Sequence, residues 1–140
     1  MSLSHQFAVV SKNSNSYIIS SEMEYASLSD NVYIYIKDSL NWINSNWCGK
    51  KVSNGLAYSG FSYIEGVFNI ENFERVIFHW KNLFELAPDE FYITGNYSID
   101  DNNYEQILLK KQDVIMELSN IIKICRKAIN INGKILHNGI

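Results

Sequence analysis

The clearest pattern of hydrophobic and polar positions lies between residues 69 and 97, where a helical period gives way to a strand. Large apolar side chains recur there at intervals of three and four residues, which places them on one face of a helix. These side chains are Ile70, Phe73, Ile77, Trp80 and Phe84. Pro88 ends the helix because it lacks a backbone N–H. Residues 91–94 then favour a strand, and Gly95-Asn96 favours a turn.

Two further patterns predict the elements of the N-terminal third. Residues 7–10 and 17–20 are apolar runs on either side of a turn-rich polar stretch, which predicts a β-hairpin. Residues 30–46 carry apolar side chains in steps of four and three. This spacing favours a helix, although residues 32–36 alone would also suit a strand.

The C-terminal part is predicted to complete a second hairpin and to add a helix and a tail. Residues 104–109 favour a strand that pairs with 90–95 across a polar, acidic loop. The last helix is expected over residues 112–130, which carry an apolar stripe of helical period. Residues 135–137 are short and apolar, so they suit an edge strand packed on the rest of the fold.

Glycines in the middle of the chain predict turns, and the segments between these turns, residues 56–58 and 61–64, are predicted to be two short strands. Most predicted strands follow one another through turns, which favours antiparallel pairing with the helices on one side. The sequence therefore predicts an α+β fold in two layers, with a mainly antiparallel sheet of about five to six short strands and three helices. At 140 residues, the chain is expected to form a single domain, 1–140.

The amino-acid composition indicates in which cellular compartment the protein works and which classes of partner it is not expected to bind. The chain is 46% hydrophobic, which is enough for a core without disulfides or structural metal. Its two cysteines, Cys48 and Cys125, are therefore read as free thiols in a reducing compartment. No leader sequence or membrane-spanning segment is recognised, so a cytoplasmic location is expected. With a net charge of −3 and only two arginines, the chain is not expected to bind nucleic acid or membranes.

The patterns that usually carry catalysis are weak or missing. Ser62 lies in the run Gly60-Phe61-Ser62-Tyr63-Ile64, which begins like the nucleophile elbow of serine hydrolases. The second glycine of that motif is missing, so a glycine bend in a sheet is the better interpretation. The histidines, His5, His79 and His137, have no histidine or cysteine at the spacing that a metal site uses. We therefore expect no catalytic residues, no metal site and no cofactor.

Four runs of the C-terminal half carry a resemblance to a known family. They are WKNLFELAP (80–88), FYITGNY (91–97), YEQI (104–107) and ILHNGI (135–140). In these runs the chain resembles the small immunity proteins of bacterial polymorphic-toxin and contact-dependent growth inhibition systems. The resemblance implies a cytoplasmic protein without enzymatic activity that binds one cognate toxin domain tightly. The partner would be the C-terminal domain of a toxin, and such domains are often basic nucleases.

The residues predicted to contact that partner combine acidic and aromatic side chains. The loop after residue 97 is the longest polar connection in the second half of the chain, and loops on rigid sheets commonly carry recognition. Acidic groups speed the encounter with a basic partner, and tyrosines supply contact area. The predicted set is Glu65, Tyr97, Asp100, Asp101, Tyr104 and Glu105.

Two other functions stay open at this point. The chain could be an intracellular interaction or regulatory module, either a monomer or a homodimer joined through a sheet edge. It could also be a small enzyme whose site assembles from distant residues, with Cys48 or His79 as the reactive group.

Overall fold

The computed structural model describes residues 3–140, and within them the chain forms three helices and eight strands. The helices are α1 (Asp30–Leu40), α2 (Val67–Glu85) and α3 (Lys111–Asn130). The strands are β1 (Ser4–Val10), β2 (Tyr25–Ser29), β3 (Asn44–Trp47), β4 (Lys51–Asn54), β5 (Phe61–Ile64), β6 (Glu90–Ser98), β7 (Asn103–Lys110) and β8 (Lys134–Asn138). The predicted α+β class is confirmed.

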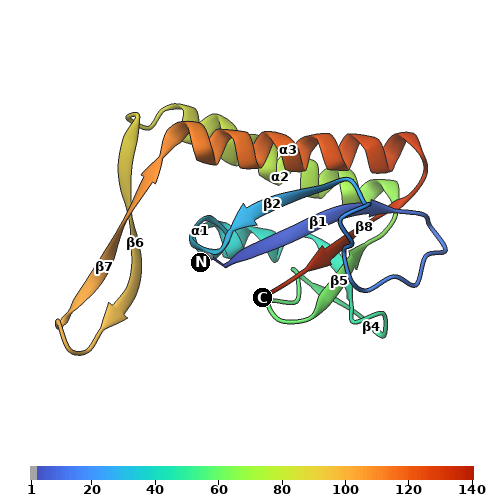
Figure 1. The fold of residues 1–140 in the computed structure, drawn as a ribbon, viewed down its shortest axis with the longest axis horizontal. Coiled ribbons are helices and arrows are strands. Elements are labelled where there is room, and N and C mark those ends of the chain that lie inside the picture. Colours follow the sequence, from blue (N-terminus) through green and yellow to red (C-terminus); the bar gives the residue numbers. More distant parts are fainter. Residues whose placement is uncertain (1–2) are drawn as a thin grey trace.

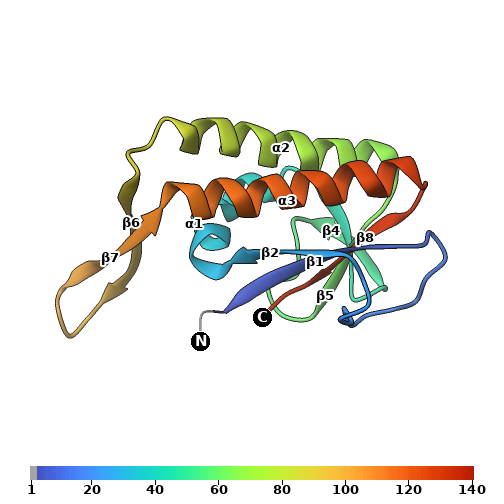
Figure 2. The same ribbon diagram turned by 45° about the horizontal axis from the view of Figure 1, so that its top comes forward.

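Six of the strands form one antiparallel sheet in the order β2-β1-β8-β5-β3-β4. Helices α2 and α3 lie side by side across one face of this sheet (Figure 1). The remaining two strands, β6 and β7, form a separate hairpin between α2 and α3, and this hairpin extends away from the main sheet (Figures 1 and 2).

The main core lies between the sheet and the helices. Strands β1 and β8 contribute side chains that are completely buried against the apolar stripes of α2 and α3. Examples are Phe7, Ile135, Phe73, Ile77 and Leu118. Of the stripe that the sequence indicated on α2, Ile70, Phe73, Ile77 and Phe84 are buried as expected. Trp80, the fifth member of that stripe, is only partly buried.

The opposite face of the sheet is covered by the connection between β1 and β2, residues 11–24. Its Ile19 and Met23 pack on a small second cluster formed by Val10, Tyr63 and Leu136. The Asn138 side chain fastens this connection, because its Oδ1 accepts the Ile19 N–H at 2.9 Å and its Nδ2 donates to the Tyr17 carbonyl at 2.8 Å.

Several boundaries differ from the sequence prediction. The strand that pairs with β1 is β2, whereas residues 17–20 belong to the covering connection. Helix α1 ends at Leu40 rather than at residue 46, because residues 44–47 pair as β3 with both β4 and β5. Residues 56–58 form no strand.

The largest positional difference concerns the C-terminal tail. Residues 135–137 were expected at an edge, but β8 lies between β1 and β5 in the middle of the sheet. All four residues from Lys134 to His137 are buried. The tail is therefore a central strand that joins the two halves of the sheet.

Candidate partner-binding surface

The β6–β7 hairpin is attached to the body at its base. Lys111, the first residue of α3, fixes the turn that follows α2, since its backbone N–H donates to the Asp89 carbonyl at 2.9 Å and its Nζ donates to the Ala87 carbonyl at 2.9 Å. The Phe91 ring lies 5.8 Å from the Phe84 ring of α2. Ile93 is only 5% exposed, so the inner face of the hairpin packs towards the body.

A bulge sets which side chains the outer face carries. Thr94 is opposite Gln106, but the next pair is Tyr97 with Tyr104, so β6 contains one more residue than β7 over this interval. The extra residue returns Tyr97 to the face on which Tyr104 lies. Their rings meet edge to face with centroids 5.1 Å apart. Gly95 lies within the bulge, where an added Cβ would be 2.7 Å from Cδ1 of Ile107.

The outer face is both aromatic and exposed. Tyr92 is 65% exposed and is paired with Leu108, which is 48% exposed. Tyr97 and Tyr104 extend the same face towards the tip with 48% and 55% exposure. Within residues 3–140, neither strand of the hairpin pairs with any other strand, so both outer edges keep free backbone groups.

The tip of the hairpin is acidic and ordered by its own hydrogen bonds. Asp100 and Asp101 are exposed in the turn. The Ser98 hydroxyl donates to Asp101 Oδ2 at 3.1 Å, and it accepts the Asp101 N–H at 3.3 Å. The Tyr97 hydroxyl donates to Oδ1 of Asn102, which adopts a positive φ of 49°. These bonds give the turn a defined shape.

The structure brings together five of the six residues predicted as partner contacts. Tyr97, Asp100, Asp101 and Tyr104 share the outer part of the hairpin, and Glu105 follows on the alternate face beside Gly95. Glu65 lies elsewhere. It precedes α2, whose 19 residues span about 28 Å before the hairpin begins.

The position of Glu65 gives it a local ionic role. Its Oε1 is 3.6 Å from Nζ of Lys134, which is only 8% exposed and also lies 3.8 Å from the centre of the Tyr63 ring. Glu65 therefore offsets the charge of a buried lysine of the central strand. It does not lie on the hairpin surface.

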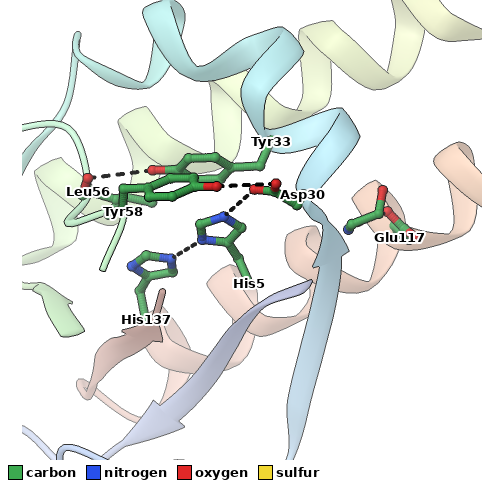
Figure 3. A network of polar contacts seen from close by, with 8 residues as sticks. His5, Asp30, Tyr33, Leu56, Tyr58, Glu117 and His137 are labelled. Carbon is green, nitrogen blue, oxygen red and sulfur yellow. Dashed lines mark hydrogen bonds and ion pairs between the residues drawn. The ribbon is translucent and has the colours of Figure 1, made fainter. Parts of the chain in front are cut away.

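A polar network around two buried histidines, absent from the sequence prediction, lies where α1 meets the sheet (Figure 3). His5 of β1 lies between Asp30 and His137 of β8. Its Nε2 is 3.2 Å from Asp30 Oδ1, and its Nδ1 is 3.0 Å from His137 Nε2. The Tyr58 hydroxyl donates to the other Asp30 oxygen at 3.2 Å. The Tyr33 ring stacks on His5 with centroids 3.6 Å apart.

The contacts of Asp30 assign the protons of both histidines. A carboxylate only accepts, so His5 carries its proton on Nε2, and its Nδ1 then accepts the proton of His137 Nε2. His137 Nδ1 is left as a buried acceptor without a hydrogen-bond partner in the described chain. Burial lowers the pKa of His137 to about 3, and it also lowers the pKa of His5, although Asp30 opposes that second effect. Both imidazoles are therefore neutral at pH 7.

The network ties α1 to strands that are distant in sequence. His5 and His137 are 132 residues apart, so no local spacing could reveal the pair. Beside it, Glu117 of α3 accepts the Ser29 N–H at 3.0 Å at the start of α1, and burial raises the pKa of this carboxyl (Figure 3). Both histidines are 0% exposed. No substrate can reach them in this conformation. Their contacts instead connect β1, β8 and the start of α1.

The residues considered for catalysis lie on different elements of the fold. Ser62 lies inside β5 with no exposure, and its hydroxyl oxygen accepts the Ala57 N–H at 2.8 Å, which is the geometry of a sheet residue and not of an exposed elbow. Cys48 is exposed in the turn between β3 and β4, and His79 is exposed on α2. Cys125 is buried in the core, and burial raises the pKa of its thiol.

Residues 3–140 offer neither a metal site nor a membrane-spanning helix. No group of three histidine, cysteine or acidic side chains in this part of the chain is placed to hold a metal ion. None of its helices combines the length and the apolar character needed to cross a membrane.

Comparisons with protein-family models, with curated proteins and with solved structures gave no match to the chain.

Proposed function

We propose that this protein is a cytoplasmic immunity protein that binds the C-terminal domain of a cognate toxin and neutralises it by covering the active site or the substrate surface. The observation that carries the proposal is the hairpin β6–β7, which leaves the body and exposes aromatic side chains beside an acidic tip. The resemblance of the runs at 80–88, 91–97, 104–107 and 135–140 to immunity proteins supports the same function.

The exposed side chains of the hairpin have little use in the isolated protein. A two-stranded hairpin is only marginally stable in water by itself, and exposed tyrosines add little to it. The same side chains suit a binding surface, since tyrosine supplies a large contact area with few rotatable bonds and recurs at the centres of interfaces. Tyr92, Tyr97 and Tyr104 lie along one face and would reach a partner together.

The tip adds charge to this surface. Asp100 and Asp101 stand at the far end of the hairpin, and no lysine or arginine lies within ion-pair distance of either one among the described residues. Exposed acidic groups attract a basic partner and orient it before contact. A basic toxin domain, for which nucleases are candidates, fits this distribution of charge.

The test uses the C-terminal domain of the protein that is encoded immediately upstream of this gene. Expression of that domain alone should arrest growth, and co-expression of this protein should restore it. Changing Asp100→Lys together with Asp101→Lys should weaken the complex at least tenfold by calorimetry, because attraction at the tip becomes repulsion.

A matched pair of substitutions controls for net charge. Glu22→Lys with Asp38→Lys changes the charge by the same amount at two exposed positions outside the hairpin. These changes should leave the affinity within about twofold. Growth arrest that this protein does not relieve, together with no measurable complex, would exclude the immunity function for that toxin. Equal effects of both pairs would instead remove the hairpin from the interface.

The edge of the main sheet favours a second candidate, an interaction module that forms homodimers. In the described residues β4 is the last strand of the sheet, and its Val52 is 71% exposed. An open edge with an exposed apolar side chain can pair with a second copy. Light scattering of the purified protein distinguishes the two candidates, since a dimer that Val52→Lys dissociates would favour the module.

A further inference from the structure

A groove of about 510 Å³ lies between the end of α1 and the middle of α2, apart from both the hairpin and the histidine network. Its apolar walls come from two tryptophans and three aliphatic side chains: Trp42, Ile43, Val76, Trp80 and Leu83. Trp42 is 77% exposed and Leu83 is 56% exposed, although both could have been polar at no cost to the core. The volume is in the range that pockets for small molecules occupy, about 300–1,000 Å³.

One wall of the groove, formed by Trp80, is fixed in place. The Trp80 indole N–H donates to the Ser39 hydroxyl at 2.8 Å, and that hydroxyl donates to the Ile36 carbonyl at 2.6 Å. The Trp80 ring also packs against Tyr35 and Phe84, with each centroid 5.8 Å away. The polar atom of Trp80 is therefore already bonded, and its ring is held rigidly as part of an apolar wall.

The lining of the groove includes an arginine and a histidine. Arg75 and His79 are one helical turn apart on α2, and both line it. No aspartate or glutamate is among the lining residues. Within residues 3–140, Arg75 forms no ion pair, whereas the neighbouring Glu74 is bound by Arg126 at 3.0 Å. Arg75 is exposed and has no ion-pair partner in the described chain, so its guanidinium can reach the apolar groove, and it also borders a neighbouring depression lined by Glu71 and Glu74.

From this geometry we propose that the groove binds a small apolar molecule that carries one acidic group. The hydrocarbon part lies between Trp42 and Trp80, and the acidic group accepts hydrogen bonds from Arg75 at the rim. Arginine suits this role because its planar fork matches a carboxylate, sulfonate or phosphate. The proposal needs no protein partner, so it stands or falls separately from the immunity function.

Two naphthylamine dyes that share one ring system test the proposal. 8-Anilinonaphthalene-1-sulfonate carries a single acidic group, and N-phenyl-1-naphthylamine has the same rings without it. We expect both dyes to bind the folded protein with increased fluorescence. Arg75→Gln should weaken the sulfonate at least about fivefold and leave the neutral dye unchanged. Trp42→Ala should weaken both dyes, because it removes the exposed wall of the groove.

Matched variants control for charge and for exposed apolar surface elsewhere. Lys37→Gln removes a cation of α1 outside the groove, and Phe68→Ala removes a side chain of α2 that is 74% exposed but does not line it. Neither should change the binding of either dye. Circular dichroism confirms that each variant is folded. Failure of both dyes to bind, or an Arg75→Gln variant that binds the sulfonate as the wild type does, would overturn the proposal and favour a protein segment as the occupant.

Discussion

The hairpin β6–β7 and the central strands β1, β8 and β5 use the same antiparallel hydrogen bonding, but they differ in what covers their side chains. In β8, four consecutive residues are buried, and helices cover one face while residues 11–24 cover the other. In the hairpin, only Ile93 is buried, and the outer face meets solvent. Strand pairing is therefore not what distinguishes the scaffold from the candidate surface. The central strands form a scaffold because both of their faces are covered. The outer face of the hairpin is not covered, so its aromatic side chains are available to a partner.

The largest change in the free energy of unfolding is expected from a substitution in the core of the scaffold. Phe73 is 0% exposed and its ring lies 5.5 Å from that of Phe7. Phe73→Ala should lower the free energy of unfolding by about 3–5 kcal/mol, since it removes a buried ring and leaves a cavity. Denaturant titration measures this loss. A loss below about 1 kcal/mol would mean that the core between sheet and helices is not packed as described.

Acid should destabilise the scaffold through its two buried histidines. An unfolded histidine titrates near 6.5, whereas burial lowers the pKa of His137 to about 3. Between these values the unfolded chain binds more protons than the folded chain, so stability falls as the pH falls through this window. At pH 5, His137 alone should cost roughly 2 kcal/mol relative to pH 7. The lowered pKa of His5 acts in the same direction.

The measurement compares unfolding free energies at pH 7 and pH 5 in the wild type and in His137→Gln. The variant is less stable at pH 7 because it disturbs the contact with His5. It should nevertheless lose less stability on acidification, since glutamine does not titrate. An identical pH dependence in both proteins would show that the acid effect originates elsewhere.

A substitution in the bulge should weaken the hairpin and leave the sheet intact. In Gly95→Ala, the new methyl group would lie 2.7 Å from Cδ1 of Ile107 and 3.0 Å from Oε2 of Glu105, so both side chains must move. We expect a local cost of about 1 kcal/mol. Hydrogen exchange should speed up for amides of β6 and β7 but not for those of β1 and β8. Faster exchange throughout would mean that the two regions unfold as one unit.

The smallest change in stability is expected from a pair of tyrosines with matched exposure. Tyr97 on the hairpin is 48% exposed, and Tyr25 on β2 of the main sheet is 46% exposed. Replacing either by alanine should change the free energy of unfolding by less than about 0.5 kcal/mol. Only Tyr97→Ala should weaken binding of the upstream toxin domain, by about tenfold or more. Equal affinity of the two variants would count against the outer face of the hairpin as the contact surface.

The elements with a strong local pattern were predictable from the sequence. The stripe of α2, the stop at Pro88 and the hairpin around residues 98–103 were all found, and α3 begins one residue before its predicted start. Each depends on contacts between residues close in the chain, where periodicity and proline chemistry determine the conformation. The same locality explains why most predicted contact residues fall on one hairpin.

The elements that depend on distant partners were not predictable. Strand β3, with the sequence NSNW, has no apolar alternation and exists because β4 and β5 pair with it on either side. The position of β8 and the contact between His5 and His137 join the two ends of the described chain. The basic groove was also missed, because its two walls come from helices separated by strands β3 to β5.

The central position of β8 has a consequence for biosynthesis. Strands β1 and β5 both pair with β8, which is the last of the three to leave the ribosome. Until it emerges, neither strand has its inner neighbour, and Phe7 and Ile64 lack the strand that lies between them. The sheet must therefore close after nearly all of residues 3–140 have been translated, through contacts of long sequence separation, which is a slow route to the native state. During that interval the unpaired edges of β1 and β5 and their apolar side chains are exposed, which is the condition under which chains tend to aggregate.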